Sequence, residues 1–197
     1  MADFIIPLLI FLLPLAYSPG PGNLFFAANG ARFGFMATLP ANLGYHGATF
    51  AVTLAIGLGF GQLSSEAPNV FIAIRYAGTV YVLWLAFRLW RPVGASHERE
   101  ARPASAIDGA MLLILNPKAY VIIGLMFSQF LASGSDATGR LFAISTIFTL
   151  NNAVAFSLYA ILADRLAAQW RDPGDVRHIN RFFAALLTGV AVWMLSS

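Results

Sequence analysis

The sequence contains no cysteine and very little charge. Of its 197 residues only 11% are charged, whereas 58% are hydrophobic, and the mean hydropathy is +0.71. The missing cysteines exclude disulfides, thiol chemistry and thiolate metal sites. A soluble domain carries about 25% charged residues, so this chain lacks roughly half of the charge that a water-exposed surface would need. These deficits indicate a protein embedded in lipid.

The apolar residues are concentrated in six runs, most of them close to the roughly 20 residues that cross a 30 Å hydrocarbon core. The runs are 4–28, 38–61, 70–90, 107–131, 141–163 and 182–195. A segment inside lipid must pair its own backbone groups, which favours helices. The sequence therefore predicts an all-α membrane protein with six transmembrane helices in one domain, 1–197, and no separate soluble domain.

Arginine is distributed unevenly among the connections. The segments after the first, third and fifth run, with their flanks, hold Arg32, Arg88, Arg91, Arg99, Arg102, Arg165, Arg171, Arg177 and Arg181. Short loops rich in arginine remain in the cytoplasm, and this accounts for the net charge of +3 without a nucleic-acid partner. We therefore expect a multi-pass protein with both termini outside and the linker 92–106 inside.

The chain divides into two similar halves, about 1–91 and 107–197, with three predicted helices each. Because three is odd, the second half must be inverted relative to the first, as in many secondary transporters. Prolines and glycines disfavour a regular helix, and they interrupt the first helix of each half. We therefore expect helices one and four to be broken. The interruptions are Ser18, Pro19, Gly20, Pro21, Gly22 and Asn23, and Asn116, Pro117 and Lys118.

The two interruptions lie at similar predicted depth. At about 1.5 Å per residue, Ser18 would lie about 21 Å and Asn116 about 17 Å below the outer surface of a 30 Å core. Inverted symmetry would then bring both into one cavity near the midplane. Lys118 supports a polar cavity, because a lysine exposed to lipid at this depth costs about 2.5–3.5 kcal/mol.

Further polar residues in helices two and five extend the predicted substrate site. Asn42 and His46 are one turn apart, and Asn151 and Asn152 occupy a comparable place in the inverted partner helix. Hydrogen bonding between helices is the alternative role for these side chains, and it stays open. We expect Lys118 and half-helix N-termini to bind a carboxylate, and Ser18, Asn23 and Asn42 to hold an ammonium.

These motifs resemble the LysE/RhtB family of amino-acid exporters over essentially the whole chain. Beyond the two interruptions, the resemblance extends to Arg75-Tyr76-Ala77-Gly78, Tyr81-Val82-Leu83-Trp84-Leu85 and Asn180-Arg181. It implies a bacterial inner-membrane transporter, not an enzyme, that uses no cofactor. It further implies that amino acids or related small zwitterionic solutes are exported by alternating access, driven by the proton gradient. The solute and the lipid bilayer are the expected partners, and homo-oligomerisation is left open.

One departure from the family pattern affects the coupling to protons. Many members have an acidic residue after a Leu-Gly in helix two, whereas here Leu43-Gly44 is followed by Tyr45-His46. No carboxylate lies well inside any predicted helix. A proton carrier would therefore be His46 or Lys118, and a neutral substrate is favoured over a cationic one.

Two other function classes remain as alternatives. An intramembrane hydrolase would use Ser18 with His46, but no third residue is in place to orient the pair. A membrane scaffold or accessory subunit would leave Lys118 without a role. A solute channel is a variant of the transporter hypothesis.

Overall fold

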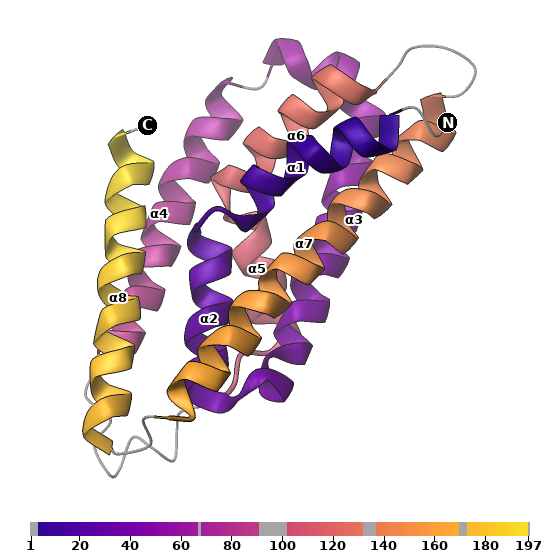
Figure 1. The fold of residues 1–197 in the computed structure, drawn as a ribbon. Helices are drawn as coiled ribbons and strands as arrows, with labels where there is room; N and C mark the ends of the chain where they lie inside the picture. The colour runs from indigo at the N-terminus through magenta and orange to yellow at the C-terminus, as the bar shows by residue number, and fades with distance from the viewer. Residues whose placement is uncertain (1–3, 67, 91–101, 132–136, 170–172, 197) are drawn as a thin grey trace.

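The computed structural model describes residues 4–66, 68–90, 102–131, 137–169 and 173–196. This part of the chain contains helices and no strand (Figure 1), which confirms the prediction of an all-α protein. Of the predicted linker 92–106, residues 92–101 lie outside the described residues. The helices are α1 (Ile5–Tyr17), α2 (Pro21–Phe33), α3 (Phe35–Glu66), α4 (Pro68–Trp90), α5 (Ala106–Ile114), α6 (Pro117–Phe130), α7 (Ala137–Ala167) and α8 (Pro173–Ser196).

Three helices begin at residues suited to a helix N-terminus. Ser105 caps α5 in a capping box, because its hydroxyl accepts from the Asp108 amide at 3.3 Å while the Asp108 carboxylate accepts from the Ser105 amide at 2.8 Å. Helices α2 and α6 begin with Pro21 and Pro117. At this first position the missing N–H has no intrahelical partner to lose.

Two pairs of consecutive helices are sharply bent. The chain turns by 60° between α1 and α2 and by 62° between α5 and α6. By length and composition, α7 can cross a membrane alone and each bent pair can cross as one span, which gives one to three crossings among the described residues. The described parts of α4 and α8 add the shorter apolar stretches Tyr76–Phe87 and Arg181–Val192. The count of six spans stays a prediction.

The long helices α3 and α7 pack against each other and organise the rest of the fold (Figure 1). Helix α2 lies along α7, α5 lies along α3, and α8 lies along α4. The start of α1, the end of α6 and the start of α7 lie at one end of the molecule in Figure 1. The end of α2, the start of α5 and the end of α7 lie at the other. The bends therefore lie between the two ends.

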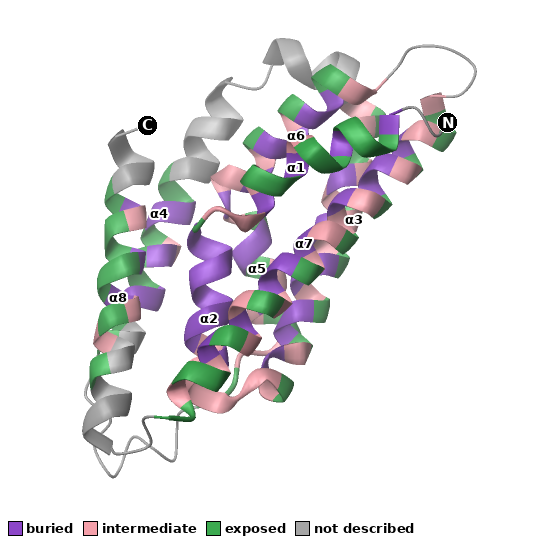
Figure 2. Ribbon diagram, viewed as in Figure 1, coloured by how far each residue is buried: buried purple, intermediate pink, exposed green. Residues whose placement is uncertain are grey.

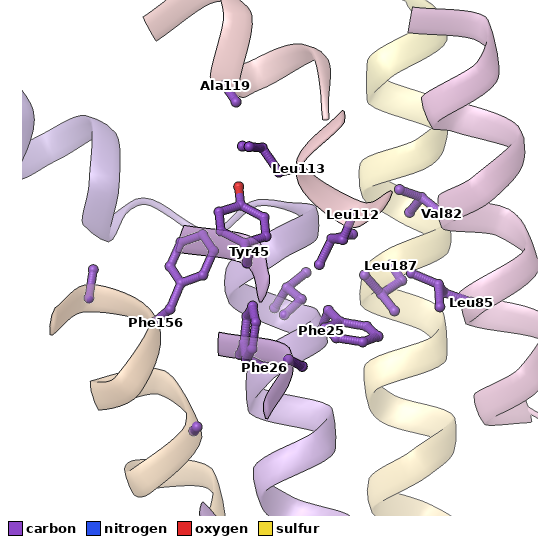
Figure 3. Close-up of a cluster of buried hydrophobic side chains, with 14 of the residues drawn as sticks. Phe25, Phe26, Tyr45, Val82, Leu85, Leu112, Leu113, Ala119, Phe156 and Leu187 are labelled. Carbon is purple, nitrogen blue, oxygen red and sulfur yellow. The ribbon is translucent and has the colours of Figure 1, made fainter. Parts of the chain in front are cut away.

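The core has two clusters of buried apolar side chains. One contains Phe26, Tyr45 and Phe156 and reaches Leu187 of α8 (Figure 3). The other packs α1 against α6 and α7 through residues such as Leu8. Exposed residues lie along the outward faces of the helices (Figure 2), and many of them are large apolar side chains, among them Ile6, Leu43, Leu58 and Val80. Soluble monomers rarely expose so much apolar surface, whereas such a surface is suited to contact with lipid.

Backbones come into direct contact where α2 packs on α7 and where α3 packs on α5. A Cβ added at Gly30 of α2 would overlap the carbonyl oxygen of Ala160 in α7. Likewise, a Cβ at Gly44 of α3 would overlap the carbonyl oxygen of Ala106 in α5. Small residues that permit such close approach are typical of helix contacts in membranes. These contacts fix α2 against α7 and α3 against α5.

Candidate substrate cavity

A cavity lies between the two bends and the helices α3 and α7. The space free of atoms in and in front of it, open solvent included, is about 290 Å³. We refer to it as the central cavity. Its lining has one charged side chain, that of Lys118, among amides, aromatic rings and aliphatic groups. The lining residues are Leu15, Ala16, Gly20, Gly22, Asn23, Tyr45, Asn116, Lys118, Ala119, Ile122, Phe148, Asn152 and Phe156.

The first bend exposes backbone carbonyls because its residues cannot continue the helix. Ser18 follows α1 with an extended backbone (φ −69°, ψ 140°), and Gly20 is extended before α2 begins. The Ser18 hydroxyl donates to the Leu15 carbonyl at 3.1 Å. Asn23 reaches back across the bend and donates from Nδ2 to the Ala16 carbonyl at 3.0 Å. A side chain from α2 thus satisfies one of the carbonyls that α1 leaves unpaired.

The second bend is arranged similarly, with side chains replacing lost backbone bonds. Asn116 is extended (φ −97°, ψ 99°) and precedes Pro117, which opens α6. The Tyr120 hydroxyl, one turn into α6, donates to the carbonyl of Ile114, the last residue of α5, at 2.9 Å. Asn116 donates from Nδ2 to the Tyr45 hydroxyl at 3.0 Å. Its Oδ1 is buried without a hydrogen-bond partner in the described structure.

Lys118 connects the two bends directly. Its ammonium donates to the Ser18 carbonyl oxygen at 2.9 Å and to the Ser18 hydroxyl at 3.0 Å. No carboxylate of the described residues forms an ion pair with it; Asp108 on α5, for example, pairs with Arg102. An ammonium held by neutral oxygens retains its full charge for an anionic ligand.

One wall of the cavity is aromatic. The rings of Tyr45 and Phe156 lie 4.8 Å apart, and both lie against Phe26, at 5.9 and 5.3 Å (Figure 3). Tyr45 comes from α3 and Phe156 from α7, so this wall closes the cavity between the two long helices. Only its Tyr45 hydroxyl offers a polar group to the interior.

The predicted site residues occupy different places around the cavity. Six line it: Gly20, Gly22, Asn23, Asn116, Lys118 and Asn152. Ser18 contacts it through Lys118. The three prolines Pro19, Pro21 and Pro117 are absent from the lining; Pro19 is exposed, while Pro21 and Pro117 start their helices.

The remaining predicted residues lie behind the cavity wall. The imidazole of His46 packs on Tyr45 and Phe156 at 5.1 and 5.4 Å, and its Nδ1 is 2.8 Å from the Asn42 carbonyl oxygen. Asn42 donates from its side chain to the Ser157 hydroxyl at 3.3 Å, a hydrogen bond between helices. Asn151 is half-buried beside the lining residue Asn152.

Several lining residues were absent from the sequence prediction. Tyr45 and Phe156 form the aromatic wall, and Leu15, Ile122 and Phe148 complete the apolar part. Within a long apolar run, the sequence does not indicate whether an aromatic residue lies on the face toward lipid or on the face toward the cavity. A weak signal existed for Phe156, which is one helical turn from Asn152 and therefore shares its face.

The chemistry of the lining suits a small anionic or zwitterionic solute. No group of three or more His, Asp or Glu residues that could hold a metal occurs in the described part of the chain. The ammonium of Lys118, the amides of Asn23, Asn116 and Asn152 and the carbonyls of the first bend can together accept and donate hydrogen bonds. They lack a group that would transfer electrons or attack a substrate with help from a general base.

Comparison with known proteins assigns the chain to a family. The model of the family described as LysE type translocator matches residues 13–197. The homoserine/homoserine lactone efflux protein of Salmonella typhimurium is 25% identical over 194 residues, covering 93% of this chain and 91% of the relative. The leucine efflux protein of Enterobacter sp. is 30% identical over 132 residues, 64% of this chain and 63% of the relative.

A third relative, the cysteine/O-acetylserine efflux protein of Salmonella choleraesuis, is 22% identical over 183 residues and 92% of each chain. No solved structure gives a significant match. The hydrolase hypothesis fails, because the family consists of translocators and because the Ser18 hydroxyl pairs with Leu15 and Lys118 rather than with His46. The chain belongs to the LysE type translocator family and is a membrane transporter.

Proposed function

We propose that this protein exports neutral amino acids or related small zwitterionic solutes from the bacterial cytoplasm by proton-coupled alternating access. The central observation is that Lys118, the only lysine of the sequence, faces the cavity from one bend while its ammonium is held by Ser18 of the other. Relatives named for the efflux of homoserine, leucine and O-acetylserine support an amino-acid-like solute.

The proposed architecture has six spans in a single domain, 1–197, built from two inverted halves. In it, α1 with α2 forms the first span and α5 with α6 the fourth, so that both bends are breaks within a span. The corresponding starts of α2 and α6 at a proline, each after an extended residue, support this reading. The arginine distribution supports placement in the inner membrane with both termini outside.

In the proposed binding mode, the solute carboxylate replaces Ser18 as the partner of the Lys118 ammonium. Charge-assisted hydrogen bonds of this kind are about twice as strong as neutral ones. The ammonium of the solute would lie against the oxygen atoms of Asn116 and Asn152 and the carbonyls of the first bend. Asn116 Oδ1, which is buried and unpartnered, supports this placement.

The charge of the cavity lining favours a solute without net positive charge. The apolar groups of Leu15, Ile122 and Phe148 line one side of the cavity and leave the polar groups gathered around Lys118. A cationic side chain would enter a lining that has no carboxylate and already contains one ammonium. We therefore expect discrimination against lysine and arginine.

Efflux from cells tests the proposal. Cells with an empty vector, the wild-type chain, Lys118→Met or Ser128→Ala are loaded with dipeptides of leucine or lysine, and amino-acid release is measured. Ser128 is an exposed residue of the same helix whose hydroxyl bonds within that helix, so Ser128→Ala is the matched control.

Wild type and Ser128→Ala should release leucine well above the empty-vector rate, Lys118→Met should fall to that rate, and lysine release should be unchanged throughout. Equal leucine release by wild type and Lys118→Met would remove Lys118 from the mechanism. Parallel cells loaded with homoserine extend the test to a second neutral amino acid. Release no faster than the vector for both neutral amino acids would contradict the proposed function.

A further inference from the structure

A continuous stripe of polar side chains runs along the buried face of α3. Asn42, His46, Thr49 and Thr53 follow one another at spacings of four, three and four residues, which places them on one side of a helix. All four are buried, with exposures of 7%, 6%, 0% and 0%. This stripe extends well beyond the central cavity, since none of the four lines it.

Helix α7 presents a matching stripe to it. The two helices are antiparallel, because Asn42 pairs with Ser157 while Gly57, farther along α3, packs on Leu141 near the start of α7. Thr49 and Thr53 therefore lie opposite the stretch from Ser145 to Asn152, whose polar residues again recur at helical spacing. We define the α3–α7 polar seam as Asn42, His46, Thr49, Thr53, Ser145, Thr149 and Asn152.

The seam contains several polar atoms that the protein itself does not pair. His46 Nε2, Thr53 Oγ1 and Thr149 Oγ1 are buried and have no hydrogen-bond partner in the described structure. Leaving a buried polar atom unpaired is costly, and in membrane proteins such atoms mark hydrated paths or ion paths. Thr49 and Ser145 instead donate to carbonyls of their own helices, at 2.8 Å each. Their lone pairs remain available.

The hydrogen bond of His46 determines which ring nitrogen can take a proton. Nδ1 lies 2.8 Å from the Asn42 carbonyl oxygen, and a carbonyl can only accept, so Nδ1 carries the hydrogen. In the neutral ring Nε2 then has a free lone pair, and Nε2 is the unpartnered atom in the seam. The imidazole is thus oriented with its basic nitrogen toward the seam, and the backbone carbonyl of Asn152 on α7 is close enough to interact with the protonated ring.

The surroundings of His46 link its charge to the cavity. Its ring contacts Tyr45 and Phe156, both of which line the cavity. The titratable groups around it are Tyr45 on its own helix, Lys118 of α6 across the cavity and Tyr159 on α7, whose hydroxyl donates to the Tyr17 carbonyl. No carboxylate occurs in residues 35–59 of α3 or in residues 141–163 of α7. On α5, which packs on α3 beside Tyr45, the carboxylate of Asp108 caps its own helix and pairs with Arg102. A proton on His46 would therefore have no counter-charge beside it.

We infer that His46 is the residue that takes up the proton exchanged for the solute, and that the α3–α7 polar seam supplies the hydrated path to its Nε2. This inference rests on the proposed function. From His46 the seam runs through Thr49 and Thr53 toward the end of α3, which is the proposed outer side. A proton passes from water in the seam to Nε2, repels the ammonium of a bound solute and so favours its release. The proton later leaves to water on the inner side, and the neutral ring readmits solute.

Two measurements test this inference separately from the proposed function. In proteoliposomes, the accumulation of labelled L-leucine and L-homoserine under an imposed pH gradient is compared with the exchange of labelled for unlabelled solute without a gradient. The variants are His46→Gln, the seam variant Thr53→Val and the control His178→Gln, which alters an exposed histidine of α8. Thermal unfolding establishes that each variant is folded.

Wild type and His178→Gln should accumulate solute. His46→Gln should retain exchange but accumulate at least tenfold less, and Thr53→Val should accumulate more slowly. Gradient-driven accumulation by His46→Gln at the wild-type level would overturn the inference, as would equal loss of exchange and accumulation in a folded variant.

The second measurement needs no transported solute. Nitrogen NMR of ¹⁵N-histidine-labelled protein in lipid nanodiscs follows each imidazole between about pH 5 and 8, where histidine serves as a switch. Assignments use His97→Gln and His178→Gln. The His46 signal should change from the Nδ1-H form to the doubly protonated form as the pH falls. A ring that stays in one form throughout would overturn the inference even if transport is observed, whereas a titrating ring without any solute transport would contradict only the proposed function.

Discussion

Lys118 and Ser18, which are 100 residues apart in the sequence, meet through two hydrogen bonds from a single ammonium group. The Ser18 carbonyl follows the end of α1, where unpaired carbonyls give the helix a partial negative charge. The ammonium that we propose for carboxylate binding is therefore already held by the opposite bend. A carboxylate must compete with Ser18 for it, which ties solute binding to the contact between the bends.

Chemical labelling provides a direct test of the Lys118 environment. Because the sequence has one lysine, acetylation by acetic anhydride can be quantified on the single peptide that contains it. Bound L-leucine or L-homoserine should slow this acetylation several-fold by occupying the ammonium, whereas L-lysine should not. An acetylation rate unaffected by either neutral amino acid at concentrations that saturate transport would contradict binding at Lys118.

The hydrogen bond between Asn116 and Tyr45 should contribute measurably to stability. Both residues are buried, at 4% and 1% exposure, and Nδ2 donates to the hydroxyl at 3.0 Å. A double-mutant cycle with Tyr45→Phe and Asn116→Ala, read by thermal unfolding, should give a coupling of about 0.6 kcal/mol, the average for such bonds in membranes. The control pair Tyr159→Phe with Asn116→Ala should be additive. Additivity in the first pair would contradict the hydrogen bond.

Gly22 leaves room for the aromatic wall of the cavity. A Cβ at this position would lie 2.7 Å from two ring carbons of Phe156, and that ring is held between Phe26, Tyr45 and His46. We expect Gly22→Ala to reduce solute release at least tenfold, and Gly22→Ala/Phe156→Leu to recover part of it, because leucine fills less of the contact. Gly47→Ala, at a site with no atom within 4 Å, is the control. Failure of Phe156→Leu to improve Gly22→Ala would show that the ring is not the obstacle.

Because Gly30 contacts the backbone of Ala160, adding even a methyl group at Gly30 should lower the stability of the protein. Gly30→Ala places a methyl group against the backbone of α7, and overpacking of this kind costs about 1–3 kcal/mol. Gly124→Ala, where nothing lies within 4 Å, should leave the unfolding temperature unchanged or raise it slightly, since alanine favours helix. Unfolding temperatures that fall equally in both variants would attribute the loss to glycine itself rather than to the helix contact.

The ends of α1 and α5 and the starts of α2 and α6 were predictable because their chemistry is local; that each pair forms one broken span stays a prediction. Proline and glycine restrict or free the backbone wherever they occur, and an amine in an apolar run must reach a polar partner. The predicted ends of the helices were less accurate: α3 spans Phe35–Glu66 against the predicted 38–61, and α7 spans Ala137–Ala167 against 141–163. Hydropathy marks the apolar part of a helix, whereas the helix continues into polar residues.

The aromatic wall was not predictable from the sequence. Whether Tyr45 or Phe156 faces lipid, core or cavity depends on the rotation of α3 and α7 about their axes, and that rotation is set by packing against distant segments. The same reason explains why the prolines at the bends were wrongly predicted to line the cavity. Pro19, Pro21 and Pro117 create the bends but do not line the cavity, because a residue that breaks a helix need not point into the space that the break opens.

The direct backbone contacts determine which helices can move together as a rigid body. Helix α2 comes from the first half of the chain and touches α7 of the second, while α3 of the first half touches α5 of the second. Surfaces without intervening side chains cannot slide past each other without collision, so each moving body would be a composite of both halves. The bends join such bodies to α1 and α6, while Gly34 links α2 to α3. A change of angle at the bends would move Lys118, Ser18 and Asn116 together. Binding of the solute and the opening of the cavity to the other side of the membrane would then occur in the same motion.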